Sequence, residues 1–572
     1  MSAATIAPRP RSRRAAVSAL RRAPAWLLTA LLAVVYLLLS PQSPDLAAAS
    51  YRSHLFSQVG FSLWDNSWYG GHHLLAYSLL APALGALIGP ALLAALSMVA
   101  ATWLFSLAIA GRVPATAERA AGLWFGVGAS IALLSSRVPF DLGLAIALGS
   151  LVLAQRDRRL AAGGLAVLAS LASPVAGAFL AMAMLAWALA ATGRQAKGVA
   201  VSSGVAVSSG VAVSSVARGP ALPAVLCLLA LVPIAFLSVA FPEGGSQPFV
   251  ASAFWPALAG VVVIGLAIPP GRRALRIGAL LYAVVLIGSF LVPSAVGGNA
   301  DRLGALAAGP LAACALLGAA QPWRRRLLLA LVLPLTYWQA NAPVTDFVST
   351  VSNRSTGASY YAPLLAELAL LDVGYGRRPA RIEVVPTVDH WEARFVAPAA
   401  MLARGWERQL DRYRNGLFYS SRALTPQRYE AWLRAQSISY VALPDASLDY
   451  SAKAEARVLG EPALRGARGA IEEIWRSRHW RLFAVRAPAP LAAAPASLEQ
   501  AGTQSFSLLA PAPGSYVVRL RFTPYWALSR GRGCVSQAPG GWTEVRAASA
   551  GTVHVVIDFS LGRIFSRGPR CD

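Results

Sequence analysis

Eleven apolar runs in the first 341 residues limit the fold more than any other feature. They cover residues 24–41, 91–110, 120–136, 140–154, 160–173, 176–191, 221–241, 250–269, 275–293, 303–320 and 326–341. A helix needs roughly 20 apolar residues to cross a bilayer. Only 13% of the residues are charged, about half the share of a typical soluble protein. The sequence therefore predicts an α-helical polytopic membrane protein with about eleven spans, and excludes a single soluble domain.

The basic residues of this half indicate its orientation. If the N-terminus is cytoplasmic, the outer loops carry only Arg52, Arg137 and Arg302, and the other twenty Lys and Arg residues before residue 342 fall inside. Cytoplasmic loops are enriched in such residues. We therefore predict a basic cytoplasmic N-terminus at 1–23, a transmembrane domain at 24–341, and an extracytoplasmic remainder. Because the basic N-terminus adjoins a span, it is expected to contact anionic lipid and not nucleic acid.

The last third of the chain has the composition of a water-soluble protein. Residues 342–486 mix helical and strand patterns, which predicts an extracytoplasmic α/β domain. Residues 487–572 alternate apolar and polar side chains, which predicts an extracytoplasmic β-sandwich. Cys534 and Cys571 are the two cysteines of this part, and two cysteines in an oxidising compartment predict a disulfide. The strands are expected at 381–386, 439–444, 480–486, 505–509, 515–522, 543–547 and 552–559, and the helices at 360–371 and 427–435.

The first outer loop, residues 42–90, holds the densest group of reactive side chains. They are Asp45, Arg52, His54, Asp65, Trp68, His72 and His73. Such a set can supply a base, an anion-binding cation and hydrogen-bond donors. An aromatic belt with solvated polar residues is the alternative. The run 74–89, broken by proline and glycine, is expected to be re-entrant or interfacial, with a twelfth span as the other possibility.

The acidic residues of the membrane half are also unevenly distributed between its two faces. Five of its seven acids fall at the outer rim: Asp45, Asp65, Asp141, Glu243 and Asp301. Acids contribute little to membrane topology, so this sorting indicates that the outer rim uses carboxylates. No cysteine or histidine spacing typical of a metal site occurs. We therefore predict no metal and no other cofactor. A divalent metal is the alternative, and nothing in the sequence supports it.

Several motifs resemble one family of membrane proteins. Asp45 is followed by Trp64-x-x-x-Trp68-Tyr69-Gly70-Gly71 and by Tyr77-Ser78-x-Leu80-x-Pro82-x-Leu84, and later come Gly297-Gly298-Asn299 with Arg302, residues 402–411 and residues 440–445. Together they resemble the GT-C superfamily, and within it large actinobacterial membrane proteins. GT-C proteins are polytopic glycosyltransferases that use polyprenyl-phosphate sugars at the outer face. The resemblance spans most of the chain.

The resemblance implies a fold and an activity. It implies transfer of a sugar from a polyprenyl-phosphate donor to a cell-envelope glycan or lipid, with the bilayer as a further partner. The position that matches the family's first-loop acid, a catalytic base or a metal contact, is Asp45, although many relatives carry adjacent acids where this chain has one. His54 is expected to assist, and Arg52 and Arg302 to bind the donor phosphate. The remaining predicted substrate-binding residues are Asp65, Trp68, His72, His73 and Asn299.

Two other functions fit the same sequence. A transporter or flippase would place charges near the middle of its spans. A non-catalytic assembly protein would bind glycan through its outer domains. Whether the chain is an enzyme is therefore left open by its residues alone.

Residues 402–411 allow two interpretations. On a helix, Arg404 and Arg408 would be four residues apart, as would Glu407 and Asp411, giving a salt-bridged surface helix over the membrane half. Trp406 would then either dock the domain or stack on a sugar.

Overall fold

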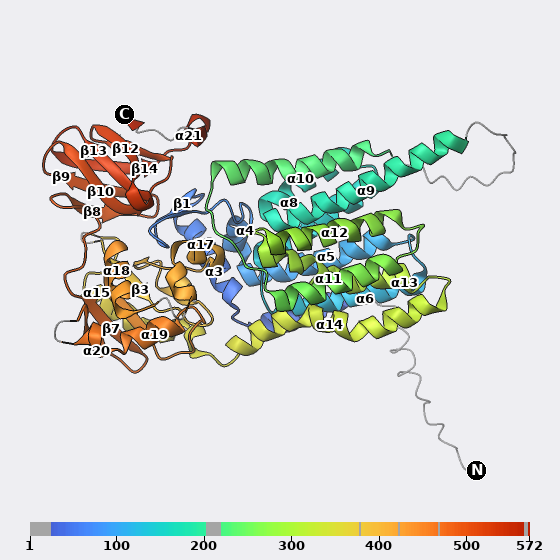
Figure 1. Ribbon diagram of the computed structural model, residues 1–572, viewed down its shortest axis with the longest axis horizontal. Helices are drawn as coiled ribbons and strands as arrows, with labels where there is room; N and C mark the ends of the chain where they lie inside the picture. Colours follow the sequence, from blue (N-terminus) through green and yellow to red (C-terminus); the bar gives the residue numbers. More distant parts are fainter. Residues whose placement is uncertain are drawn as a thin grey trace, which may run out of the picture.

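The computed structural model describes residues 24–201, 219–376, 379–420, 424–466, 469–565 and 570–571, and the side chains of all these except 193–201 and 570–571. The predicted basic segment 1–23 lies outside the described residues. The chain forms a helical bundle with two strand-rich domains at one end (Figure 1). The helical first half and the strand-rich second half that the sequence predicts are thus confirmed.

Eleven helices lie where the apolar runs predict them. Six are long and apolar enough to cross a membrane individually, and the pair of α2 and α3, bent by 80°, makes a seventh candidate. The number of spans and their orientation therefore stay predictions. The eleven are α2 (Ala25–Leu39), α5 (Pro90–Ile109), α6 (Ala115–Ala132), α7 (Val138–Gln155), α8 (Arg159–Ala172), α9 (Pro174–Val201), α10 (Ala221–Ala240), α11 (Ala251–Ala267), α12 (Arg273–Leu291), α13 (Asp301–Leu316) and α14 (Pro322–Thr350).

Small residues let the bundle helices approach closely, and large apolar residues cover its outside. At Gly143 on α7, a Cβ would lie 2.8 Å from the Cβ atoms of both Ser173 and Ala176. Close approach through small residues is typical of membrane helices. Leu38 and Leu333 are 79% and 80% exposed, as expected for side chains that face lipid. Sequence composition and packing therefore agree on a membrane setting.

The first outer loop folds between the bundle and the strand-rich domains. It contains α3 (Pro44–Val59), a two-stranded ribbon of β1 (Trp64–Asp65) and β2 (His72–His73), and α4 (Ala81–Ile88). Ser43 caps α3 by accepting a hydrogen bond from the Leu46 amide at 3.4 Å. With eight residues, α4 is much shorter than a span.

The first strand-rich domain is a five-stranded mixed sheet covered by helices. The strand order is β4-β3-β5-β7-β6, with β3 parallel to β4 and β5, and β7 antiparallel to β5. The strands are β3 (Arg381–Val384), β4 (Met401–Leu402), β5 (Ile438–Pro444), β6 (Ile471–Arg476) and β7 (Trp480–Val485), and the helices are α15 (Ala358–Leu370), α16 (Glu392–Phe395), α17 (Arg408–Arg414), α18 (Pro426–Ala435), α19 (Lys453–Leu459) and α20 (Pro462–Arg465).

The second strand-rich domain is a sandwich of two four-stranded sheets, β10-β13-β12-β15 and β11-β14-β9-β8. Val518 and Val555 are fully buried between them. Cys534 is disulfide-bonded, and Cys571 stands opposite it in the register; because the side chain of Cys571 is not described, their pairing stays a prediction. The strands are β8 (Ser497–Ala501), β9 (Ser505–Ala510), β10 (Gly514–Arg521), β11 (Trp526–Arg530), β12 (Gly533–Ala538), β13 (Trp542–Ala547), β14 (Gly551–Ile557) and β15 (Arg570–Cys571). A short helix, α21 (Leu561–Phe565), lies between β14 and β15 in the sequence.

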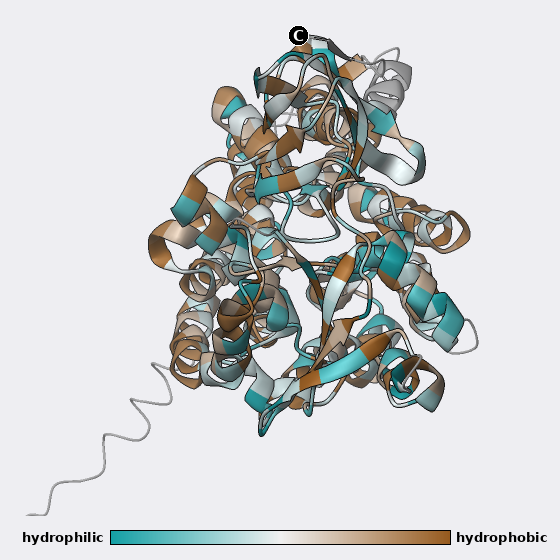
Figure 2. Cartoon of the chain, turned by 90° about the vertical axis from the view of Figure 1, so that its left-hand side faces the viewer, coloured by the Kyte–Doolittle hydropathy of each residue, from teal (hydrophilic) through white to brown (hydrophobic). Residues whose placement is uncertain are grey.

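One buried arginine joins the two strand-rich domains, which Figure 2 shows facing the viewer. Arg381, at the start of β3, donates hydrogen bonds to the carbonyl oxygen of Gln436 in its own domain and, at 2.6 Å, to that of Arg519 in the sandwich. Burial lowers the pKa of Arg381 to about 9. This contact fixes the sandwich against the α/β domain.

Candidate functional site

A cavity of about 620 Å³ lies between one end of the bundle and the α/β domain. Its charged and polar walls come from segments far apart in the sequence. Three carboxylates mark the helix ends that meet there: Asp141 in the first turn of α7, Asp301 at the start of α13, and Asp346 near the end of α14. The other charged and polar residues that line it include Asp45, Arg52, Arg137, Asn299, Arg302, Glu407, Arg408 and Gln409.

Four of the nine predicted catalytic and substrate-binding residues line this cavity. They are Asp45, Arg52, Asn299 and Arg302. Arg137, the third arginine of the predicted outer rim, joins them there. The three arginines and three of the five acids that the sequence sorts to one face thus share one hollow.

Asp45 stands in the first turn of α3, beside an arginine held between two acids. Its Oδ2 lies 3.4 Å from Arg137 Nε, and Arg137 Nη2 lies 3.8 Å from Asp346 Oδ2. Ser135 donates a hydrogen bond to Asp346. The Asp45 side chain is 30% exposed, so a hydroxyl group in the cavity can reach it.

Arg302 differs from the other cavity arginines because it has no acidic partner. Among the described residues it makes no hydrogen bond or ion pair, and its guanidinium carbon lies 5.5 Å from the Phe140 ring centre. The neighbouring Asp301 instead accepts a hydrogen bond from Trp338 at 2.9 Å. Arg302 also lies in the first turn of α13, where the helix dipole favours an anion. This part of the cavity is therefore suited to bind an anionic group.

The Gly297-Gly298-Asn299 motif explains how Arg302 is placed. Gly297 has φ +36°, and a Cβ there would collide with the carbonyl oxygen of Gln247, itself a cavity residue. Asn299 bonds back to the Ala295 carbonyl at 3.2 Å. The motif forms a tight 3₁₀ turn that leads directly into α13.

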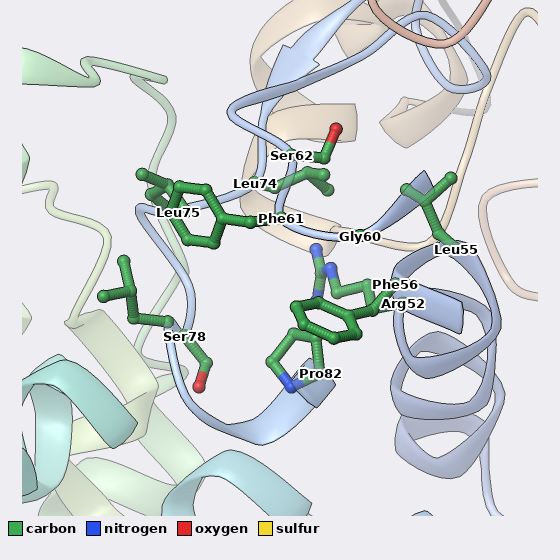
Figure 3. Close-up of a pocket in the computed structure, with 11 residues that line it drawn as sticks. Arg52, Leu55, Phe56, Gly60, Phe61, Ser62, Leu74, Leu75, Ser78 and Pro82 are labelled. Atoms are coloured by element: carbon green, nitrogen blue, oxygen red, sulfur yellow. The ribbon is translucent and has the colours of Figure 1, made fainter. Parts of the chain in front are cut away.

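Arg52 is buried in α3 and faces two hollows. Its Nη2 lies 3.5 Å from Glu407 Oε2, without a hydrogen bond, and its guanidinium carbon lies 4.3 Å from the Tyr77 ring centre. Arg52 also borders a separate apolar slot beside Leu55 and Phe56 (Figure 3). At about 30 Å³ that slot is too small for a sugar. The larger cavity is therefore the candidate substrate site.

The other predicted site residues of the first loop lie outside the cavity lining. His54 is half-buried on α3, and burial lowers its pKa, with a further contribution from Arg394. His73 forms an ion pair with Glu243 at 2.8 Å and approaches Thr523 of the sandwich at 3.1 Å. His73 thus makes contacts within the protein, whereas His54 lies away from the cavity.

Asp65, Trp68 and His72 form the core of the loop. Trp68 is fully buried and stacks on Tyr51 and His72, with ring centres 4.5 Å and 5.4 Å away. Asp65 accepts hydrogen bonds from the Tyr51 hydroxyl at 2.9 Å and the Ser67 amide at 2.8 Å. Burial lowers the pKa of His72. In this structure the three residues shape the loop.

The loop motif docks onto the other motif at 402–411. The Leu402 amide donates to the Ser67 carbonyl at 2.8 Å. A Cβ on Gly405 would lie 2.4 Å from Trp68 Cγ. Next to it, the Tyr69 hydroxyl accepts a hydrogen bond from the Glu407 amide at 2.9 Å. Two sequence motifs more than 300 residues apart therefore fold as one unit.

The predicted surface helix over 402–411 is wrong. The helix begins only at Arg408, because Gly405 packs against Trp68 and Glu407 is extended, with φ −145°. Arg404 is 4% exposed and binds Asp411 at 2.7 Å. The segment is a buried connection that delivers side chains to the cavity.

In addition to Gln409, three cavity side chains of this segment were not predicted as site residues. Arg408 makes two 2.8 Å hydrogen bonds to Asp449, and Trp406 stacks on His390 with ring centres 3.7 Å apart. Although burial opposes it, hydrogen bonds to Asp449 and Glu392 raise the pKa of His390. The third residue is Glu407. The Trp-Glu-Arg run was visible in the sequence, but its position at the cavity was not.

The described residues include no cluster of three or more His, Cys, Asp or Glu side chains able to hold a metal ion. Within the cavity, the space between Asp45 and Asp346 is occupied by Arg137.

No protein-family model and no curated protein matches the chain. The solved structures that share weak similarity with it include two of an archaeal oligosaccharyltransferase. The apo crystal structure of the Archaeoglobus fulgidus oligosaccharyltransferase is 13% identical, with 73% of this chain and 69% of that chain covered and a TM-score of 0.43. The oligosaccharyltransferase AglB of the same organism, in complex with an inhibitory peptide and a dolichol-phosphate, has the same identity and coverage and a TM-score of 0.35. Similarity at this level leaves function to be argued from the cavity.

Proposed function

We propose that this protein is a membrane glycosyltransferase that moves a sugar from a polyprenyl-phosphate donor to a cell-envelope glycan at the outer face. The observation that carries the proposal is the position of Arg302, an arginine without an acidic partner, in the same cavity as the carboxylate of Asp45. A phosphate needs the cation, and a hydroxyl acceptor needs the carboxylate.

In this proposal the donor phosphate binds Arg302 at the start of α13, and Arg52 adds a second cation. Arginine binds phosphate with two parallel hydrogen bonds. Asp45 takes the proton of the acceptor hydroxyl, whose oxygen forms the new bond to the anomeric carbon of the sugar. The bond from that carbon to the phosphate oxygen breaks, and the polyprenyl phosphate leaves with the electron pair, stabilised by the arginines. Attack from the opposite face inverts the anomeric configuration.

The cavity gives less support to a transporter. A carrier would use charged groups near the middle of its spans, whereas Asp141 and Asp301 lie in the first turns of α7 and α13. The charged groups of the cavity therefore gather at one end of the bundle, which supports a site for a lipid headgroup.

Donor binding can be tested without knowing the sugar. The purified protein in detergent is titrated with undecaprenyl phosphate, and the Kd is measured by native mass spectrometry. We expect R302Q to weaken binding by roughly tenfold or more, the usual effect of losing a charged hydrogen bond. R354Q, which removes an exposed arginine of the α/β domain, should bind as the wild type does. Equal Kd values for R302Q and wild type would contradict the proposed phosphate site.

Catalysis is tested separately at Asp45. Membranes containing the protein are supplied with polyprenyl-phosphate [14C]mannose, glucose or arabinose in turn, and label in envelope glycan is counted. D45N should lose transfer by at least a hundredfold, within the range for a general base, while its Kd for undecaprenyl phosphate stays within threefold of wild type. Full transfer by D45N would remove Asp45 as the base and favour a non-catalytic role.

A further inference from the structure

The cavity has two chemically different sides. The bundle contributes Arg302 and Asn299, whereas the α/β domain contributes Trp406, Glu407 and Gln409. A lipid-linked donor enters from the bilayer, so its phosphate meets the bundle side. The side formed by the water-soluble domain is left for the second substrate.

Glu407 is the unusual group on that side. Its side chain is 9% exposed, and its Oε2 has no hydrogen-bond donor although Arg52 Nη2 lies 3.5 Å away. A buried polar atom without a partner is rare in proteins and carries a free-energy penalty. Arg52 balances the charge of Glu407 but donates no hydrogen bond to it, so the hydrogen-bonding capacity of this carboxylate is left for a hydroxyl group in the cavity.

The protein holds the Glu407 backbone firmly in place. Its amide donates to the Tyr69 hydroxyl at 2.9 Å, and the same hydroxyl donates to the Glu407 carbonyl at 3.3 Å. Tyr69 itself is buried and has φ +60°, and Gly70 follows with φ +74°. The Trp-Tyr-Gly-Gly motif thus positions a side chain that enters the cavity from another domain.

The neighbours of Glu407 narrow the class of molecule. Arg408 already binds Asp449 through two hydrogen bonds, so its charge is compensated. What remains for a ligand is the part of the Trp406 indole ring not covered by His390 and Arg408, the carboxylate of Glu407 and the amide of Gln409. Aromatic surface together with hydrogen-bonding groups suits the apolar faces and hydroxyls of a sugar, and does not suit a second anion.

We propose that residues Trp406–Gln409 form the acceptor subsite, and that Glu407 accepts a hydrogen bond from a hydroxyl of an acceptor glycan. This rests on the proposed transferase function and names its second substrate as a polyhydroxylated sugar chain presented from the aqueous side. Glu407 selects and positions the acceptor, while Asp45 acts on the hydroxyl that reacts.

The test measures acceptor binding apart from donor binding. Purified full-length protein is titrated with octyl disaccharides of mannose, arabinose and galactose, and the Kd is measured for each. For those that bind, E407Q should raise the Kd about tenfold or more, because one charged hydrogen bond is lost. The Kd for undecaprenyl phosphate should not rise, because Arg52, the ion-pair partner of Glu407, keeps its charge in E407Q. E407D keeps a carboxylate on a shorter side chain, so its Kd for the disaccharides should lie between those of wild type and E407Q.

E430Q is the matched control, because Glu430 is an exposed glutamate of the same domain paired with Arg434. E430Q should change neither the Kd for the disaccharides nor the Kd for undecaprenyl phosphate. The proposal is overturned if E407Q binds the disaccharides as tightly as wild type, if it weakens undecaprenyl phosphate equally, or if wild type binds none of the disaccharides. A wild type that binds disaccharide in a Glu407-dependent manner but no undecaprenyl phosphate would overturn the proposed donor and leave the acceptor subsite standing.

Kinetics distinguish this role from a structural one. Where transfer to an octyl disaccharide is measurable, E407Q should raise the acceptor KM and keep kcat within threefold. A thermal unfolding midpoint lowered together with kcat would indicate loss of the fold, and would count against an acceptor-binding role.

Discussion

At the residue scale, the α/β domain buries three carboxyl groups around a single arginine. Arg404 faces three carboxylates: Asp411 at 2.7 Å, Glu455 at 3.4 Å and Glu383 at 4.0 Å. Burial raises the pKa of Glu383 well above its usual range and that of Glu455 to about 7. Although burial opposes it, Arg404 lowers the pKa of Asp411. One arginine therefore holds one ionised partner and two acids that retain their protons more readily.

This cluster predicts a pH-dependent stability. In the unfolded chain Glu455 titrates near its ordinary value of 4.5, and in the folded domain near 7. As the pH rises between these values, the unfolded state loses its proton first, so the contribution of Glu455 to stability is greatest at low pH and falls toward neutrality. We expect the unfolding midpoint of wild type to drop by on the order of 5 °C between pH 5 and pH 8.

E455Q should show a smaller drop than wild type, because the amide cannot ionise. The midpoints are followed by intrinsic fluorescence in detergent, with the exposed-site variant E430Q as control. If the unfolding midpoints of wild type and E455Q fell equally with pH, Glu455 would be excluded as the source of the pH dependence.

At the scale of elements, periodicity in the sequence located most helices and seven of the fifteen strands of the described residues, but not how they meet. Eleven apolar runs sufficed to place eleven helices because each run is long and internally consistent. The end of α14 was missed: the helix continues past residue 341 to Thr350 and carries Asp346 into the cavity. Its polar last turns gave no apolar signal, and only the folded structure shows their neighbours.

The same limit applies to the candidate site. The sorting of charges to one rim predicted Asp45, Arg52 and Arg302 as site residues, and they do line one cavity. Glu407 could not be found in this way, because its position depends on the docking of Gly405 against Trp68. Contacts between distant segments leave no periodic pattern in a single sequence.

The packing of Gly405 against Trp68 gives a prediction for the segment 402–411. G405A would place a methyl group against Trp68, and overpacking of this kind lowers stability by about 1–3 kcal/mol. We expect a lower unfolding midpoint and weaker binding of octyl disaccharide, because residues 406–409 shift with the turn. G416A is the control, since a Cβ there meets no atom within 4 Å. A G405A protein with wild-type midpoint and binding would show that the segment tolerates the change.

At the scale of the whole molecule, the predicted orientation puts the strand-rich domains outside the cell. Ser549 of the sandwich and Gln321, before α14, are both exposed. In intact cells a membrane-impermeant maleimide should label S549C, and label Q321C only after permeabilisation, with the unsubstituted protein as background. The opposite pattern would reverse the topology and separate the cavity from an outer-leaflet donor.

The cavity has one wall from residues near 45, others from residues near 140, 300 and 346, and the last from residues 406–409. A ribosome must therefore complete more than two thirds of the polypeptide before all of these walls exist. If the proposed chemistry is right, a partly made chain is inert, and premature consumption of lipid precursors during biogenesis is prevented by the architecture itself.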